Sequence, residues 1–293
     1  MGWGEVFALG AALAWAYAVI LMRRAGERLP ALELNLFKNS LGLMLVLATV
    51  LLAAGPSLPK YPLPELAIVF FSGFLGIAVA DTLYLKALNT MGASRTGIVS
   101  ALYTPFVILL SATFLAESLN AWQWAGFVCV MGGIVLVTWR RAKSDADADS
   151  VRKGTLYAIL AMAAMATGIV MVKGILEQRP LLWTLELRML GGWAGLVLFI
   201  TLRRSWPKTL QRFSQPQPWG TIVLASVLAG YLGFMMWLAG YKLLPASEAA
   251  ILNETNNSFI VLLAWLLLGE HIDRRKILGL ALTVVGVMMM ILI

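Results

Sequence analysis

Apolar residues occur in runs of roughly twenty along almost the whole chain, which is the length that crosses a bilayer as a helix. Short polar segments separate the runs, and several carry Pro and Gly, as in GPSLPKYPLP at 55–64. A chain that crosses a membrane must satisfy its backbone N–H and C=O groups by hydrogen bonds, and helices do this within each segment. The strands of a transmembrane barrel would show alternating apolar and polar residues, so we expect helices. The pattern predicts an all-α polytopic membrane protein with ten transmembrane helices, at about 5–22, 32–54, 65–87, 94–115, 121–139, 154–174, 181–202, 218–241, 246–268 and 275–293.

The helix expected at 246–268 interrupts its apolar run with a polar block. The block consists of Asn253, Glu254, Thr255, Asn256, Asn257 and Ser258. An amide or a carboxylate in hydrocarbon is costly unless it is paired or hydrated. Four of the six, Asn253, Glu254, Asn257 and Ser258, fall within about 140° of one helix face. We therefore predict a substrate-binding wall made by Asn253, Glu254, Asn256, Asn257 and Ser258, the alternative being an interhelical polar clamp.

The two halves of the chain resemble each other at a fixed offset. At a shift of 150 residues Gly4, Glu27 and Pro30 meet Gly154, Glu177 and Pro180, and Lys38 meets Arg188. At a shift of 153 residues Ser94 meets Ser247 and Glu117 meets Glu270. A repeated unit of five helices must enter the membrane from opposite sides, so the sequence predicts two inverted repeats around a central site. The predicted units are 1–143 and 154–293, joined by a charged linker at 144–153.

Charged residues are sparse and unevenly placed. They make up 13% of the chain, whereas 60% of it is hydrophobic, which leaves no room for a separate soluble domain. The net charge of +8 comes from Lys and Arg at helix ends, so it does not indicate nucleic-acid binding. Loops after the odd-numbered helices carry 17 of these cations and the opposite side carries 4, which predicts both termini outside the cytoplasm.

Four charged residues inside predicted helices are candidates for binding substrate or protons. Lys38 and Arg188 each sit about two turns in, where one of them would bind a substrate carboxylate; the alternative is snorkelling or pairing with Glu33 or Glu186. Asp81 is either a buried charge partner or a second proton site. Glu254 would bind a substrate ammonium, carry a proton, or alternate between the two.

Aromatic side chains complete the predicted site. We expect Trp15, Tyr84, Tyr103 and Trp237 to line the cavity, although aromatic residues in membrane helices more often serve in packing or as interfacial anchors. The chain has one cysteine and one histidine, so we expect no metal site and no cofactor.

The end of each half carries a recurring pattern. Gly269-Glu270 is followed by Gly279 and Gly286, and the first half repeats this as Ala116-Glu117, Gly126 and Gly133. With the ten-helix layout and the early basic residues Lys38 and Arg188, this pattern resembles the EamA-type branch of the drug/metabolite transporter superfamily. The resemblance implies a secondary transporter of the bacterial cytoplasmic membrane, most often an exporter of amino acids or related compounds.

The chain departs from that family in two respects. A proline is common midway along the ninth helix, but the counterpart of Pro105 here is Ser258. The resemblance also implies cytoplasmic termini, whereas the distribution of Lys and Arg favours the opposite orientation.

The expected activity is alternating-access transport of a small zwitterionic or cationic molecule, without enzymatic chemistry. Lipids are the other expected partners, and the protein is expected to act as a monomer or a homodimer. A membrane enzyme acting on lipid-linked phosphate and a channel are the alternatives. The enzyme is disfavoured because no nucleotide-binding loop or metal-ligand spacing occurs, and the channel because the polarity is concentrated in one place.

Overall fold

The computed structural model describes residues 2–57, 59–115, 121–138, 145–244 and 246–291. Within these ranges the regular structure is entirely helical. The elements are α1 (Trp3–Ala25), α2 (Ala31–Ala53), α3 (Leu63–Gly73), η1 (Phe74–Asp81), α4 (Thr82–Met91), α5 (Ala93–Ser100), α6 (Tyr103–Leu115), α7 (Ala121–Thr138), α8 (Asp145–Gln178), α9 (Leu181–Leu202), α10 (Trp206–Ser214), α11 (Trp219–Ser226), η2 (Val227–Gly233), α12 (Phe234–Leu243), α13 (Ala246–Leu268) and α14 (Arg274–Ile291).

Six helical stretches of the described chain are long and apolar enough to cross a membrane. They are Trp3–Ala25, Ala31–Ala53, Leu63–Met91, Ala148–Gln178, Leu181–Leu202 and Trp219–Leu243. Shorter apolar segments at Trp124–Gly133 and Thr255–Leu268 fall within two further predicted spans. The chain is therefore an all-helical, polytopic membrane protein, and the number of ten spans stays a prediction.

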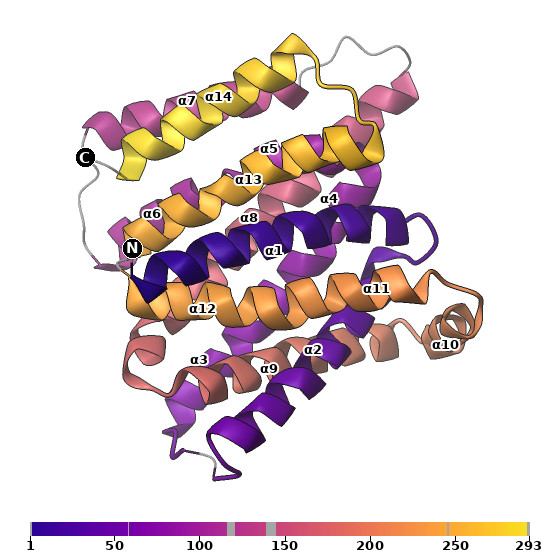
Figure 1. Ribbon diagram of the computed structural model, residues 1–293, viewed down its shortest axis with the longest axis vertical. Helices are drawn as coiled ribbons and strands as arrows, with labels where there is room; N and C mark the ends of the chain where they lie inside the picture. Colours follow the sequence, from indigo (N-terminus) through magenta and orange to yellow (C-terminus); the bar gives the residue numbers. More distant parts are fainter. Residues whose placement is uncertain (1, 58, 116–120, 139–144, 245, 292–293) are drawn as a thin grey trace.

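The helices run side by side (Figure 1). The first residues of α1 and the last residues of α14 lie on one side of the molecule, while α10 lies on the other. Helix α1 lies between α12 and α13 and packs against both. Helices α7 and α14 form a separate pair at the edge of the molecule.

Glycines of the recurring pattern make the contact between α7 and α14. A Cβ on Gly133 would lie 2.7 Å from the carbonyl oxygen of Gly279, and one on Gly286 would lie 2.6 Å from that of Gly126. The two contacts exchange under the 153-residue shift. Small residues at such crossings let helix backbones approach closely, so these glycines serve packing.

Two π-helical segments occupy equivalent places in the two halves. Segment η1 starts at Phe74 and η2 starts at Val227, so the starts differ by 153 residues. A π-helix is uncommon and frequently marks a functional site. Each segment lies in the middle of a membrane-spanning stretch, between α3 and α4 or between α11 and α12.

Most of the segment expected as a linker is helical. Helix α8 starts at Asp145, nine residues before the predicted span at 154. Acidic residues favour a helix N-terminus, and Asp149 pairs with Lys153 one turn later at 2.6 Å. The charged composition therefore marks the first turns of a long helix.

The fourth predicted span is two helices, whereas the ninth is one. Helix α5 ends at Ser100 and α6 begins at Tyr103. Pro105 has no N–H to offer the carbonyl of Ala101, and its ring crowds that carbonyl, so a helix breaks there. In α13 the equivalent residue, Ser258, lets the helix continue. The proline thus explains why the first half has two short helices, α5 and α6, where the second half has the single helix α13 with its polar block.

Glu270 caps the first turn of α5. Its Oε1 accepts a hydrogen bond from the N–H of Ala93 at 2.7 Å, and its Oε2 accepts one from the N–H of Ser94 at 3.1 Å. Gly92, with φ of 88°, leaves room for the carboxylate. Burial would raise the pKa of this carboxyl, but the hydrogen bonds from Ser94 and Ala93 and the charge of Lys276 outweigh it, so its pKa is lowered.

We expect Glu270→Gln to destabilise the protein by about 1 kcal/mol at neutral pH, the usual contribution of a helix cap. Because the folded-state pKa is depressed, the stabilisation is present above the unfolded value, near 4.5, and is lost as the pH falls through the folded value. Thermal unfolding in detergent from neutral to acidic pH would therefore show the gap between wild type and variant closing. A gap that stays constant, or that equals the effect of Glu177→Gln at an exposed ion pair, would contradict the prediction.

Candidate substrate-binding cavity

The structure holds a central cavity enclosed by helices from both halves. It offers about 870 Å³ free of protein atoms, counting its open mouth. Its lining residues are Trp15, Val19, Met22, Lys38, Asp81, Tyr84, Leu85, Ser100, Tyr103, Met162, Met165, Ala229, Phe234, Trp237, Asn253, Asn256 and Asn257.

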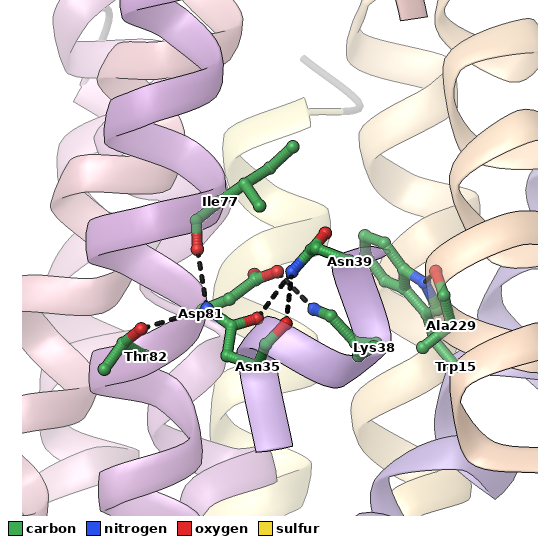
Figure 2. A network of polar contacts seen from close by, with 8 residues as sticks. All are labelled: Trp15, Asn35, Lys38, Asn39, Ile77, Asp81, Thr82 and Ala229. Atoms are coloured by element: carbon green, nitrogen blue, oxygen red, sulfur yellow. Dashed lines mark hydrogen bonds and ion pairs between the residues drawn. The ribbon is translucent and has the colours of Figure 1, made fainter. Parts of the chain in front are cut away.

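A buried ion pair lies on one wall of this cavity (Figure 2). Lys38 of α2 donates from Nζ to Oδ2 of Asp81, the last residue of η1. The two residues are only 5% and 8% exposed. The Nζ of Lys38 also lies 5.5 Å from the ring centroid of Phe234. Glu33, the alternative partner predicted for Lys38, instead forms an ion pair with Arg212 of α10.

Two asparagines hold α2 against η1 beside this pair (Figure 2). The Nδ2 of Asn35 donates to the carbonyl of Ile77 and to Oγ1 of Thr82, each at 2.9 Å. Asn39 donates to the side-chain oxygen of Asn35 at 2.7 Å. Sequence analysis missed these residues, although Asn35, Lys38 and Asn39 are spaced by three and four and therefore share a helix face. They fix the turn of α2 that carries Lys38.

Aromatic side chains form the facing wall. The Nε1 of Trp15 donates to the carbonyl of Ala229 in η2 at 3.1 Å. The ring of Trp15 stacks on Trp237, with centroids 5.8 Å apart, and meets Phe234 edge-on at 5.6 Å. A carbonyl of each π-helical segment thus accepts a hydrogen bond from a side chain of another helix.

Arg188 lies behind this aromatic wall and is not among the lining residues. It is 4% exposed, and its guanidinium carbon lies 5.4 Å from the ring centroid of Trp237. Its Nε has no hydrogen-bond partner among the described residues. Asp81 lies within electrostatic range of the guanidinium. Glu186 does not pair with it; the Oε2 of Glu186 is itself buried without a hydrogen-bond partner in the described structure.

Helix α13 contributes three of the predicted polar residues to the cavity. Asn253, Asn256 and Asn257 line it, and Ser258 does not. Within the described structure, Nδ2 of Asn253 and Oδ1 of Asn256 are buried without a hydrogen-bond partner. Glu254 belongs to the same helix, but its side chain lies outside what the structure describes.

Of the predicted aromatic residues, Trp15, Tyr84, Tyr103 and Trp237 all line the cavity, as does Asp81. Sequence analysis missed Phe234 and the methionines Met22, Met162 and Met165. A methionine in an apolar membrane helix cannot be told from a packing residue by sequence. Phe234 could have been found, because the 153-residue shift places it at the position of Asp81.

Among the described residues, no three His, Cys, Asp or Glu side chains lie close enough together to hold a metal ion. The arrangement instead offers a balanced ion pair, two buried amide atoms without a hydrogen-bond partner in the described structure, and an aromatic wall. These groups can hydrogen-bond a polar group and contact an apolar one.

Known proteins resemble this chain in sequence and fold. Relatives include the pseudopaline exporter CntI of Pseudomonas aeruginosa, 28% identical over 135 residues and 46% of either chain, and the uncharacterised transporter YvbV of Bacillus subtilis, 22% identical over 150 residues, 51% of this chain and 49% of YvbV. A probable 4-amino-4-deoxy-L-arabinose-phosphoundecaprenol flippase subunit, ArnE of Pectobacterium atrosepticum, is 37% identical over 71 residues, 24% of this chain and 62% of ArnE. The matches to CntI and YvbV thus span about half the length of those relatives.

A chain of a solved crystal structure shares the fold across 99% of this chain and 96% of its own length, with a TM-score of 0.70 and 20% identity. The family model described as the EamA-like transporter family matches residues 2–139 and again residues 152–292. These matches cover nearly the whole chain, and the relatives of known activity are transporters by name. The chain belongs to the EamA-like transporter family.

Proposed function

We propose that the protein is a secondary active transporter of the bacterial cytoplasmic membrane. It exports amino acids or related zwitterionic or cationic metabolites by alternating access. The observation that carries the proposal is the polar edge of α13, where Nδ2 of Asn253 and Oδ1 of Asn256 are buried at the cavity without partners in the described structure. A buried polar atom without a partner is costly, so a ligand that supplies one is stabilised.

A zwitterion matches these groups best. The amide of Asn253 offers a donor to a carboxylate, and the oxygen of Asn256 offers an acceptor to an ammonium group. The nearby pair of Lys38 and Asp81 carries one charge of each sign. A zwitterion therefore enters without adding net charge to a low-dielectric site.

Alternating access is supported by the internal duplication. The family model matches the chain twice, and the π-helical segments and the α7–α14 glycines recur at a shift of 153 residues. Two inverted five-helix repeats, 1–143 and 154–293, would place the cavity between them. Export as the direction follows the names of two relatives, an exporter and a probable flippase subunit.

Proton coupling through Glu254 and Asp81 completes the proposal. Glu254 would release its proton when a substrate ammonium binds and take up a proton when the substrate leaves, so substrate and proton would move in opposite directions. Asp81, which pairs with Lys38, would be the second proton site and would likewise be protonated while the carrier is free of substrate.

Counterflow in proteoliposomes tests this function. We expect saturable exchange of at least one pool of labelled amino acids, accelerated by a pH gradient. Asn256→Leu should raise KM about 10-fold or more, since a hydrogen bond to a charged group is lost. Ser258→Ala on the same helix, outside the cavity lining, is the matched control and should transport like the wild type. Glu254→Gln should lose the acceleration by the pH gradient.

Three results would contradict the proposal. Flux that never saturates would indicate a channel, and chemical conversion of the substrate would indicate an enzyme. Wild-type rates for Glu254→Gln over about pH 6–8 would remove Glu254 from coupling.

A further inference from the structure

A second pocket lies on the other side of the η1–α4 stretch from the central cavity. It offers about 410 Å³ of free space, counting its open mouth. Asp81, Tyr84 and Leu85 face the central cavity, whereas Val79, Leu83 and Lys86 line this pocket. The two sites therefore share a helix but not a lining residue.

Two cations stand at this pocket without a matching anion. They are Lys86 of α4 and Arg203, which follows α9. Arg203 lies within electrostatic range of Lys86. In the described part of the chain neither forms an ion pair with a carboxylate; the Nζ of Lys86 instead lies 5.7 Å from the ring centroid of Tyr157. Two like charges held together are unfavourable unless an anion joins them.

The rest of the lining is apolar except for Thr82, whose hydroxyl already accepts a hydrogen bond from Asn35. Leu32 of α2, Val79 and Leu83 of the η1–α4 stretch, and Phe199 of α9 form its walls. The pocket therefore combines a cationic mouth with a hydrocarbon-compatible groove. A free phosphate or a soluble metabolite would use the first feature but not the second.

Both cations belong to the side of the molecule where the loops carry most of the Lys and Arg. The amphipathic helix α10 lies there too, three residues after Arg203. By the charge distribution this side faces the cytoplasm, whose leaflet carries anionic lipids. The 150- and 153-residue shifts place Ala53 and Ala239 at the positions of Arg203 and Lys86, so packing of the repeated unit does not require the two charges.

We propose that this pocket binds the headgroup phosphate of an anionic phospholipid between Lys86 and Arg203, with an acyl chain along Leu32, Leu83 and Phe199. The apolar groove selects a lipid over a free anion. Basic pockets between membrane helices bind lipid headgroups in this way.

Lipid titration of the delipidated protein in neutral detergent, followed by native mass spectrometry and thermal unfolding, tests the proposal. The probes are phosphatidylglycerol, phosphatidylcholine with the same acyl chains, and inorganic phosphate. We expect phosphatidylglycerol to bind wild type and to raise its Tm. The variant Lys86→Gln/Arg203→Gln should bind it about 30-fold more weakly, because each cation near a membrane surface contributes about 5-fold.

The matched control is Arg204→Gln/Lys208→Gln, which removes the same charge from the same side but outside the pocket lining. It should bind phosphatidylglycerol like the wild type. Arg203→Gln alone, at an exposed residue that folding does not bury, should weaken binding about 5-fold and gives a second measurement if the double variant does not fold. Equal loss in the control, equal binding of phosphatidylcholine, or full stabilisation by inorganic phosphate alone would each overturn the proposal.

Discussion

Asp81→Asn is expected to destabilise the folded protein by about 3–5 kcal/mol, because it leaves the ammonium group of Lys38 buried without its partner. Lys38→Met should have a similar effect through the unpaired Asp81. Both groups are nearly inaccessible to solvent and lie among helices of both halves. Thermal unfolding in detergent, compared with wild type, would measure the loss.

The double variant Lys38→Met/Asp81→Leu separates stability from function. Replacing both charges by apolar groups of similar volume often restores the stability that either single change removes. We therefore expect a folded double variant that transports no substrate, because the cavity has lost both charges. Transport at the wild-type rate would show that the pair only supports the fold, and additive losses of stability would show that the two side chains do not interact.

Gly73→Ala is expected to prevent correct packing of α3 and η1 against α9, at about 3 kcal/mol or more. A Cβ on Gly73 would lie 1.8 Å from the carbonyl oxygen of Arg188 and 2.7 Å from its carbonyl carbon. These are backbone atoms, so α9 itself would have to move. The same movement would shift the guanidinium of Arg188 from the ring of Trp237.

Gly174→Ala is the matched control, because a Cβ there meets no atom within 4 Å. In the interior of helix α8 this change should stabilise by about 0.5–1 kcal/mol. The yield and Tm of monodisperse protein on size-exclusion chromatography would compare the two variants. Equal behaviour of both variants would show that the contact between Gly73 and α9 is not needed for folding.

Part of the fold and part of the candidate site could be predicted from the sequence. The apolar runs located the long helices, and the polar block located a wall of the cavity, because hydrocarbon penalises unpaired polar groups wherever they occur. Lys38 and Asp81 were recognised separately. Their pairing was not, because it joins residues 43 positions apart, and the sequence offers nearer alternatives such as Glu33 and Lys86. The side chain of Glu254 lies outside what the structure describes, so its role in substrate and proton binding stays a prediction.

Other features were visible in the sequence but ambiguous. Pro105 was noted as a family proline, and the structure shows that it separates α5 from α6. Met162 and Met165 contribute to the cavity, but they have the same polarity as their packing neighbours. The π-helical segments left no recognisable pattern, since they depend on contacts with other helices such as the hydrogen bond from Asn35 to Ile77.

The position of α1 has a consequence for biosynthesis. Helix α1 is synthesised long before its principal neighbours α12 and α13, which come from the second half of the chain. During that interval its inner face lies against lipid or other chains. From Trp3 to Ala16 the buried residues of α1 are small, namely Gly4, Ala8, Ala11, Ala12 and Ala16. Such residues tolerate hydrocarbon and allow close backbone contact when the helices dock. Insertion of α12 and α13 therefore completes the packing of α1.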